Sequence, residues 1–287
     1  MNRIALWAAR AAVVGALSAT VFVAGIASAS TNGRSLSPGD HTFTLSVQGI
    51  QRSFILHVPT GAPAAKRPLI LVYHGHGATA AGTIGVTDFE QESDRTGELV
   101  AFLQGVNNHW NEYSGVFGAS GINDVTYTKA VIYDIAAHIG FDHARIVAAG
   151  FSNGALMVES LGCQLARTLS LVVPVEGQLA TSMVKACKPA RPINVYEIHG
   201  TADASIPYGG GGYIGVLSAP KSVAKWASLD HCAKTPTSSP PKSGVVMTTY
   251  RLCRKSTHVA LMTIEGGVHR WTPNIGEIVT AAFPWKS

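Results

Sequence analysis

The stretch Arg145–Met157, RIVAAGFSNGALM, decides the fold. An apolar run over Ile146–Ala149 leads into Gly150–Gly154, and helix-forming residues follow from Ala155. A G-x-S-x-G motif needs a strand, a tight turn with serine at its apex, and a helix. Strand and helix nearly touch beside the serine, so only small residues fit there. A glycine-rich turn without activity can contain the same residues, so the motif alone does not establish a nucleophile. Partners for Ser152 have to be found in the rest of the chain.

Apolar and helix-forming segments alternate on both sides of this stretch. A continuous apolar run, typical of a parallel strand buried on both faces, occurs at Pro68–Tyr73, a shorter apolar run occurs at Leu99–Leu103, and segments rich in strand-forming residues occur at Leu169–Val175 and Ile193–Ile198. We predict an antiparallel edge pair at Thr42–Val47 and Arg52–Val58, helices at Asp124–Ile139, Ser222–Leu229 and Gly276–Phe283, and further strands at Val245–Leu252 and His258–Ile264. This order predicts an α/β fold with a mostly parallel central sheet and helices on both faces. Thr235–Gly244 is expected to be a surface loop.

The first residues have the pattern of an export signal. Arg3 and Arg10 are followed by an uncharged apolar run, and Ala27-Ser28-Ala29 fits the small-residue cleavage rule. We predict a signal peptide over residues 1–29 and one large α/β domain over residues 30–287, with an extracellular location. An uncleaved anchor is the alternative, but the run is short for a membrane span.

Charge and cysteine content limit the kinds of partner, disulfide and metal site that are expected. The formal net charge is +5 and no Lys/Arg run occurs, so nucleic acid is not an expected partner. Four cysteines in an exported chain indicate two disulfides, and three pairings are possible. The favoured pairing joins the local partners Cys163–Cys187 and Cys232–Cys253. A metal site is the weaker alternative because the chain has no C-x-x-C motif.

A serine nucleophile needs a base within hydrogen-bond reach and an acid that holds the base. In α/β-hydrolases both follow the serine along the chain. His269 lies in a glycine-containing loop after the predicted strand His258–Ile264, and it is the predicted base. Asp203 lies in the loop after Ile193–Ile198 and is the predicted acid. The alternatives are His199, His231 and His258 for the base, and Glu176 and Asp230 for the acid.

Backbone N–H groups are expected to bind the charge that develops on the substrate. One is the N–H of Asn153, and the other is that of His76 or Gly77 in the loop after Pro68–Tyr73. A metal bound by His74 and His76 is the alternative interpretation of that loop, but we expect neither a metal nor a cofactor. Aromatic residues near these loops are candidates for substrate contacts: Trp110, Tyr208 and Trp271, with Tyr113 and Tyr213.

These segments resemble a known family. Pro68–Gly77, Trp110-Asn111, Arg145–Met157, His199–Gly210 and Ile264–Trp271 are similar, in this order, to the secreted polyhydroxybutyrate depolymerase and feruloyl esterase family, the esterase-D-like carbohydrate esterases of the α/β-hydrolases. The resemblance implies Ser152 as nucleophile, Asp203 as acid and His269 as base, and it supports the favoured cysteine pairing. The chain departs from the family pattern at Val268, Thr272 and His76.

The sequence as a whole predicts a secreted serine carboxylic-ester hydrolase that works through an acyl-enzyme. The expected substrate is a small ester, a polyester or an esterified polysaccharide. A monomer without a stable membrane anchor is expected. The alternatives are an acyltransferase with the same three residues and a non-catalytic binding protein on the same scaffold.

Overall fold

A computed structural model describes residues 36–60, 67–112 and 121–282. These residues all belong to one compact unit, Gly33–Ser287. The predicted signal peptide, residues 1–29, lies outside the described residues. Among the helices in the described ranges, none combines the length and the apolar character needed to cross a bilayer.

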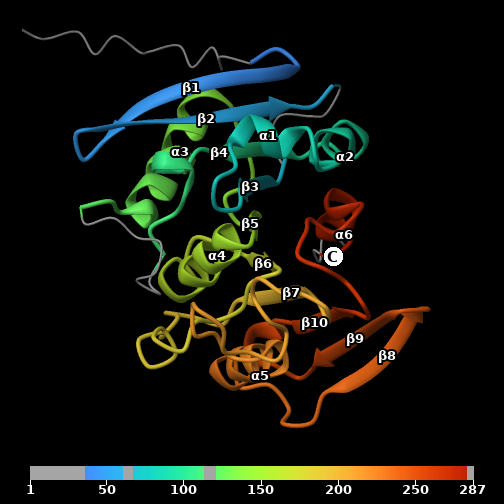
Figure 1. The fold of residues 1–287 in the computed structure, drawn as a ribbon. Helices are drawn as coiled ribbons and strands as arrows, with labels where there is room; N and C mark the ends of the chain where they lie inside the picture. Colours follow the sequence, from blue (N-terminus) through green and yellow to red (C-terminus); the bar gives the residue numbers. More distant parts are fainter. Residues whose placement is uncertain (1–35, 61–66, 113–120, 283–287) are drawn as a thin grey trace, which may run out of the picture. The chain divides into compact units, whose positions relative to one another are not determined.

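A single ten-stranded sheet organises the chain (Figure 1). Its spatial order is β1-β2-β4-β3-β5-β6-β7-β10-β9-β8. In chain order the strands are β1 Gly39–Val47, β2 Ile50–Val58, β3 Leu69–Tyr73, β4 Leu99–Leu103, β5 Ile146–Phe151, β6 Leu171–Val175, β7 Asn194–Gly200, β8 Thr237–Lys242, β9 Val245–Tyr250 and β10 Val259–Ile264. The strands in the middle of this order are parallel to one another: β4, β3, β5, β6, β7 and β10. Antiparallel strands complete both edges. The predicted fold class is therefore confirmed.

Helices cover both faces of this sheet. They are α1 Ala80–Ile84, α2 Phe89–Thr96, α3 Asp124–His138, α4 Asn153–Gln164, α5 Ala219–Leu229 and α6 Ile275–Ala282, with short 3-10 helices at Val106–Asn108 and Arg254–Ser256. Because side chains alternate along a strand, Leu69, Leu71 and Tyr73 of β3 join one core, which α3, α4 and α5 cover. Ile70 and Val72 face the other core, to which α1, α2 and α6 contribute (Figure 1).

One predicted loop is a strand instead. Thr237–Lys242, inside the expected loop Thr235–Gly244, pairs with β9 as the outermost strand of the sheet. The segment contains Pro240 and Pro241, which donate no backbone hydrogen bond and are tolerated only at edges and bulges. The register with β9 shifts between Ser239 and Lys242, so the prolines coincide with an irregularity in the pairing.

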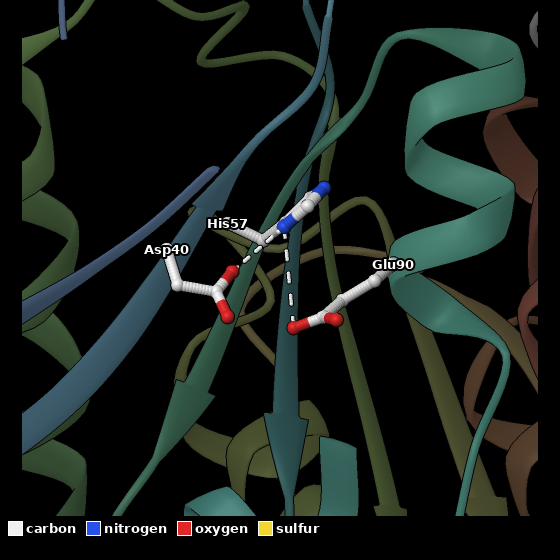
Figure 2. A group of neighbouring side chains, drawn as sticks. All are labelled: Asp40, His57 and Glu90. Atoms are coloured by element: carbon white, nitrogen blue, oxygen red, sulfur yellow. Dashed lines mark hydrogen bonds and ion pairs between the residues drawn. The ribbon is translucent and has the colours of Figure 1, made fainter. Parts of the chain in front are cut away.

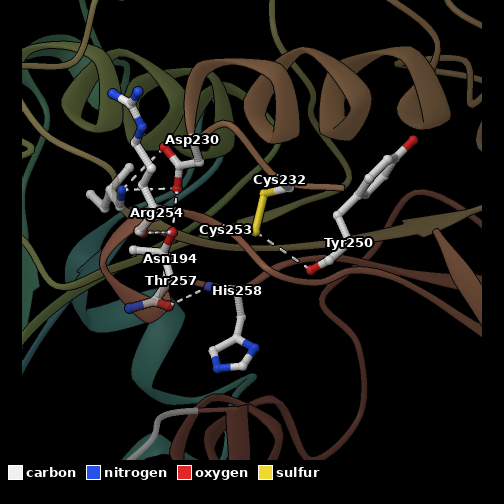
Figure 3. Close-up of a disulfide and its surroundings, with 9 residues drawn as sticks. Asn194, Asp230, Cys232, Tyr250, Cys253, Arg254, Thr257 and His258 are labelled. Carbon is white, nitrogen blue, oxygen red and sulfur yellow. Dashed lines mark hydrogen bonds between the residues drawn. A yellow bond between two sulfur atoms is a disulfide. The ribbon is translucent and has the colours of Figure 1, made fainter. Parts of the chain in front are cut away.

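The predicted disulfide pairing is confirmed. Cys163–Cys187 joins the end of α4 to the segment before β7, and Cys232–Cys253 joins the segments that follow α5 and β9. Closing loops of this length contributes about 3 kcal/mol each in the chain-entropy account. Figure 3 shows the second bridge beside Asp230, whose carboxylate accepts hydrogen bonds from Ile193 N–H at 3.0 Å and Thr257 Oγ1 at 2.9 Å. Asp230 is thus a structural residue of this corner.

Candidate active site

Ser152 occupies a strained turn between β5 and α4. Its backbone has φ 57° and ψ −119°, a conformation that is costly for a residue with a side chain. Its N–H donates to Val175 O at 3.0 Å, which fixes the turn against the end of β6. The flanking glycines are obligatory: a Cβ at Gly150 would lie 2.3 Å from Gly154 O, and one at Gly154 would lie 2.3 Å from Tyr73 O. The motif therefore has the sharp geometry that exposes a serine hydroxyl.

His269 and Asp203 meet Ser152 in one hydrogen-bonded row. The Nε2 of His269 lies 2.8 Å from Ser152 Oγ, and its Nδ1 lies 2.7 Å from Asp203 Oδ2. Asp203 comes from the loop after β7, and His269 from the loop after β10. These strands are parallel neighbours, so their carboxyl ends bring both loops to the same edge of the sheet as Ser152.

Asp203 is buried but supplied with donors. Its Oδ1 accepts hydrogen bonds from the N–H groups of Ser205 at 2.7 Å and Ile206 at 2.9 Å. Burial alone would raise the pKa of Asp203, but the hydrogen bonds of its carboxylate with His199, His269 and Ile206 hold that pKa well below its usual range. The group is therefore a carboxylate, as an acid that orients an imidazole must be.

Glu176, the alternative acid, lies behind Asp203. It follows β6 with a left-handed backbone, φ 50°, and its side chain is buried. Both carboxyl oxygens lie 3.0 Å from Gly200 N, and Oε2 lies 3.4 Å from His199 Nε2. Burial raises the pKa of Glu176 to about 8. Among the described contacts it is Asp203, not Glu176, that reaches the ring of His269.

His199 holds the acid loop. Its Nε2 lies 2.9 Å from Ile206 O and 3.4 Å from Asp203 Oδ2. The ring is completely buried, so it cannot exchange a proton with a substrate. This agrees with the expectation that His199 is less suited than His269 to act as a base.

The loop after β3 lies directly over the nucleophile. A Cβ at Gly75 would be 3.5 Å from Ser152 Cβ and 2.9 Å from the Phe151 ring, so this position has to be glycine. Gly77 was one of the two expected donors to the oxyanion, but its N–H donates to Asn108 O at 2.7 Å and is therefore already engaged. His76 is exposed, and its ring lies 5.7 Å from that of His109.

Asn153 is the first residue of α4, where backbone N–H groups have no partner inside the helix. Its buried side chain accepts a hydrogen bond from Trp110 N at 2.7 Å, and its amide donates to Trp110 O at 3.3 Å. The helix start is thereby tied to the segment around Trp110. The N-terminal end of α4, with its partial positive charge, lies beside Ser152.

Trp110 does not contact a substrate, contrary to the sequence-based prediction. Its side chain is fully buried, and its Nε1–H donates to His74 O at 2.8 Å. His74 is buried as well, with Nδ1 2.8 Å from Gly75 O and Nε2 accepting from Gly105 N at 3.0 Å. Burial lowers the pKa of His74, which favours this neutral ring. Both nitrogens are used inside the protein, so the pair holds the loop in place and leaves no lone pair for a metal.

Two of the predicted aromatic contacts are half-buried. Tyr208 OH lies 2.9 Å from Thr263 Oγ1, and Trp271 packs edge-on against Phe89 with ring centroids 6.1 Å apart. Phe151 was not predicted, although it is the variable residue directly before Ser152. Its ring lies 4.7 Å from that of His269 and 5.4 Å from that of Trp271. It forms an aromatic support beneath the base.

Comparisons with known proteins agree with this geometry. Feruloyl esterase B of Piromyces equi is 30% identical over 229 residues, which cover 76% of this chain and 42% of that protein. The bifunctional acetylxylan esterase/xylanase XynS20E of Neocallimastix patriciarum is 22% identical over 227 residues, 77% of this chain and 31% of that protein. The chain therefore spans less than half the length of these two relatives. No model of a known protein family matches it.

The solved structures give the same fold. An acetyl xylan esterase from Aspergillus awamori superposes with a TM-score of 0.61 and 12% identity, over 84% of this chain and 98% of that one. The fold is that of the α/β-hydrolases, and the similar proteins are named as esterases. Within that class the chain is similar to feruloyl and acetyl xylan esterases, so the predicted resemblance to carbohydrate esterases is confirmed.

Proposed function

We propose that this protein is a secreted serine carboxylic-ester hydrolase in which Ser152, His269 and Asp203 form the catalytic triad. The observation that carries the proposal is the unbroken row of hydrogen bonds, 2.8 Å from Ser152 Oγ to His269 Nε2 and 2.7 Å from His269 Nδ1 to Asp203 Oδ2. With its proton on Nδ1, the imidazole donates to the carboxylate and accepts from the serine hydroxyl.

The proposed reaction has two halves. Ser152 Oγ attacks the ester carbonyl carbon while its proton moves to His269 Nε2, and the same proton then goes to the departing alkoxide, which leaves as the alcohol. Water next attacks the acyl-enzyme while one of its protons moves to His269 Nε2, and that proton then goes to Ser152 Oγ as the bond to the acyl group breaks and the acid product leaves. The ionised Asp203 stabilises the imidazolium in both halves. These steps require no cofactor.

The oxyanion of each tetrahedral intermediate is proposed to bind at the start of α4. The N–H of Asn153 supplies one donor, and His76 in the loop above Ser152 is proposed as the other. The closeness of Gly75 to the nucleophile, where an added Cβ would lie 3.5 Å from Ser152 Cβ, supports this position for the loop. A single such donor contributes about 10²–10³-fold to kcat in well-studied serine hydrolases.

The proposed substrates are esters of the feruloyl and acetyl-xylan kind, because the relatives carry those names. Half-buried Tyr208 and Trp271 are proposed to contact the substrate. A panel of feruloyl, acetyl-xylan and hydroxybutyrate esters would rank the acyl groups by kcat/KM. We expect turnover of a feruloyl or acetyl ester to exceed that of the hydroxybutyrate ester.

Export is proposed from the signal-like residues 1–29 and from the two disulfides, which persist in oxidising compartments. N-terminal sequencing of the exported protein checks this directly. We expect a mature chain that begins at Ser30. The monomeric state and the absence of a membrane anchor stay predictions.

The direct test of the activity compares wild type with Ser152→Ala on short-chain nitrophenyl esters. We expect the variant to lose at least about 10³-fold in kcat, since removal of a triad member leaves only the contributions of the oxyanion site and of substrate binding. Unchanged turnover would refute the mechanism. Acyl transfer to a sugar or alcohol that outpaces hydrolysis would replace the hydrolase with an acyltransferase.

A further inference from the structure

A second cluster of titratable side chains lies at the β1–β2 edge of the sheet, apart from the triad. Asp40 of β1 and His57 of β2 are directly paired across the two strands. Glu90 and Asp94 belong to α2. Figure 2 shows the carboxylates of Asp40 and Glu90 both turned toward the same ring nitrogen of His57.

The distances in this cluster suit a small cation. His57 Nδ1 lies 2.8 Å from Asp40 Oδ1 and 3.9 Å from Glu90 Oε1, and one ligand atom from each residue lies within 4.8 Å of the others. Two ligand atoms of a tetrahedral zinc ion lie about 3.4 Å apart when each bond is about 2.0–2.1 Å long. The two distances from His57 Nδ1 bracket that value, and the ligand atoms of Asp40 and Glu90 lie within 4.8 Å of each other, so side-chain shifts on the order of 1 Å would complete the geometry.

The cluster has an excess of negative charge. Three carboxyl groups, those of Asp40, Glu90 and Asp94, face one imidazole, and in the described ranges their only ion-pair partner is His57. Glu90 Oε1 is buried and makes no hydrogen bond to the described residues. A bound cation would give that oxygen a partner and would offset the excess of negative charge.

His57 is placed as metal-binding histidines usually are. Its side chain is only 9% exposed, and its Nε2 makes no hydrogen bond within the described residues but lies 3.5 Å from Asp94 Oδ1. Thr60 N–H donates to the same oxygen at 3.1 Å and holds it there. A metal-bound histidine typically donates its remote N–H to such a carboxylate, which fixes the tautomer and the ring orientation.

We propose that His57 Nδ1 and one carboxylate oxygen each from Asp40 and Glu90 bind a divalent transition-metal ion of the zinc class. The imidazole ligand favours such an ion over Ca²⁺ or Mg²⁺, which prefer oxygen ligands alone. Asp94 orients His57 from behind. Asp40 is 45% exposed, so water can reach a fourth coordination position. The ion would join β1, β2 and α2, and so fasten the edge hairpin to the helix.

The test is a titration of the full chain with ZnCl₂ after metal removal by a chelator and dialysis. We expect one saturable site by calorimetry and a rise in Tm on zinc addition. His57→Gln and Glu90→Gln should weaken binding more than tenfold, and Asp94→Asn by about tenfold, as expected for a supporting carboxylate. The matched control is His41→Gln, since His41 is adjacent to Asp40 on β1 and bonds Ser37 O instead.

Two results would overturn the proposal. Absence of saturable zinc binding to the wild type would mean that a proton shared between Glu90 and Asp40 satisfies the cluster. Wild-type affinity in Glu90→Gln would place the ion elsewhere. If His57→Gln does not fold, the Glu90 and Asp94 variants still decide the question. Binding and Tm are measured without any activity assay, so the outcome is independent of the proposed esterase mechanism.

Discussion

Asp203 and the pair Glu159–Glu197 are all buried, yet they differ in charge. Glu159 on α4 and Glu197 on β7 are completely buried, and burial raises the pKa of Glu159 to about 8 and that of Glu197 well above its usual range. The pKa of Asp203, only a few residues beyond Glu197, is instead lowered: burial would raise it, but the hydrogen bonds of Asp203 outweigh burial.

The number of available donors explains the difference. Asp203 lies in a loop, where the N–H groups of Ser205 and Ile206 are not used by a strand ladder and turn to its carboxylate. Glu197 lies within β7, in register with Leu261 of β10, so the backbone around it is engaged in the sheet. Among described contacts Glu159 accepts from Trp226 Nε1 at 2.7 Å, and neither oxygen of Glu197 makes a hydrogen bond. Burial disfavours the ionised form of a carboxyl group, and hydrogen bonds from free N–H groups in a loop can outweigh that effect.

The largest effect is expected when the charge of Asp203 is removed. Asp203→Asn replaces an acceptor by an amide that can donate to His269 Nδ1, which reverses the tautomer that the triad needs. We expect kcat on a nitrophenyl ester to fall by about 10³–10⁴-fold with little change in KM. Asp134→Asn, on the outside of α3, is the control and should keep wild-type kcat. A loss below tenfold in Asp203→Asn would show that another acid, first of all Glu176, supports His269.

The next effect concerns stability. Because the pKa of Glu159 is raised on folding, the stability that its neutral form contributes is complete below the unfolded pKa of about 4.3. That stability is lost as pH rises through about 8. Glu159→Gln keeps the neutral form at every pH. The pKa difference corresponds to about 5 kcal/mol, of which about 1 kcal/mol is already present at pH 5, so we expect the stability of the variant relative to wild type to be about 4 kcal/mol higher at pH 9 than at pH 5, measured as a difference in Tm.

The control for this measurement is Glu277→Gln, which changes an exposed glutamate of α6. Its difference in Tm from wild type should be the same at pH 5 and pH 9. A Glu159→Gln variant that is equally destabilised at both pH values would contradict a neutral Glu159. The carboxyl would then have to be ionised and paired in the folded protein.

The smallest effect is expected at Glu176, a buried carboxyl group with a raised pKa that lies beside the ionised Asp203. Its pKa is raised to about 8, so it is neutral at pH 6 and gains a charge beside Asp203 as pH rises through that value. The new charge lies beside Asp203 and would help to stabilise the imidazolium that forms on His269 during the reaction. Glu176→Gln should therefore match wild-type kcat within about threefold at pH 6 and fall modestly below it above pH 8, as expected for one removed neighbouring charge. A large loss at pH 6 would show that the ionised form of Glu176 is required.

The parts of the fold that the sequence predicted well are those set by local pattern. β4 begins and ends where its apolar run does, and the G-x-S-x-G turn has the expected strand and helix. α2 was not predicted because Phe89 is its only apolar residue, so no helical stripe is visible. β8 was not predicted because its prolines are compatible with a strand only at an edge, and edge position depends on the whole sheet.

The candidate site divides in the same way. Ser152, Asp203 and His269 follow from loop position after parallel strands, a rule that the chain order carries. The burial of Trp110 and the hydrogen bond from Gly77 N–H to Asn108 depend on how distant loops pack, and no spacing rule contains that information. Glu176 was considered only as an alternative acid. Its position behind Asp203 results from the parallel pairing of β6 and β7, which brings the ends of these two strands side by side.

The central claim, that Ser152 is a nucleophile activated through His269, is tested most directly by covalent labelling. The protein is treated with a fluorophosphonate at pH 7, digested, and analysed by mass spectrometry. We expect a single adduct, on the peptide that contains Ser152, and labelling slowed by at least about 10³-fold in His269→Ala. An adduct on another residue, or equal labelling rates in wild type and His269→Ala, would contradict the account.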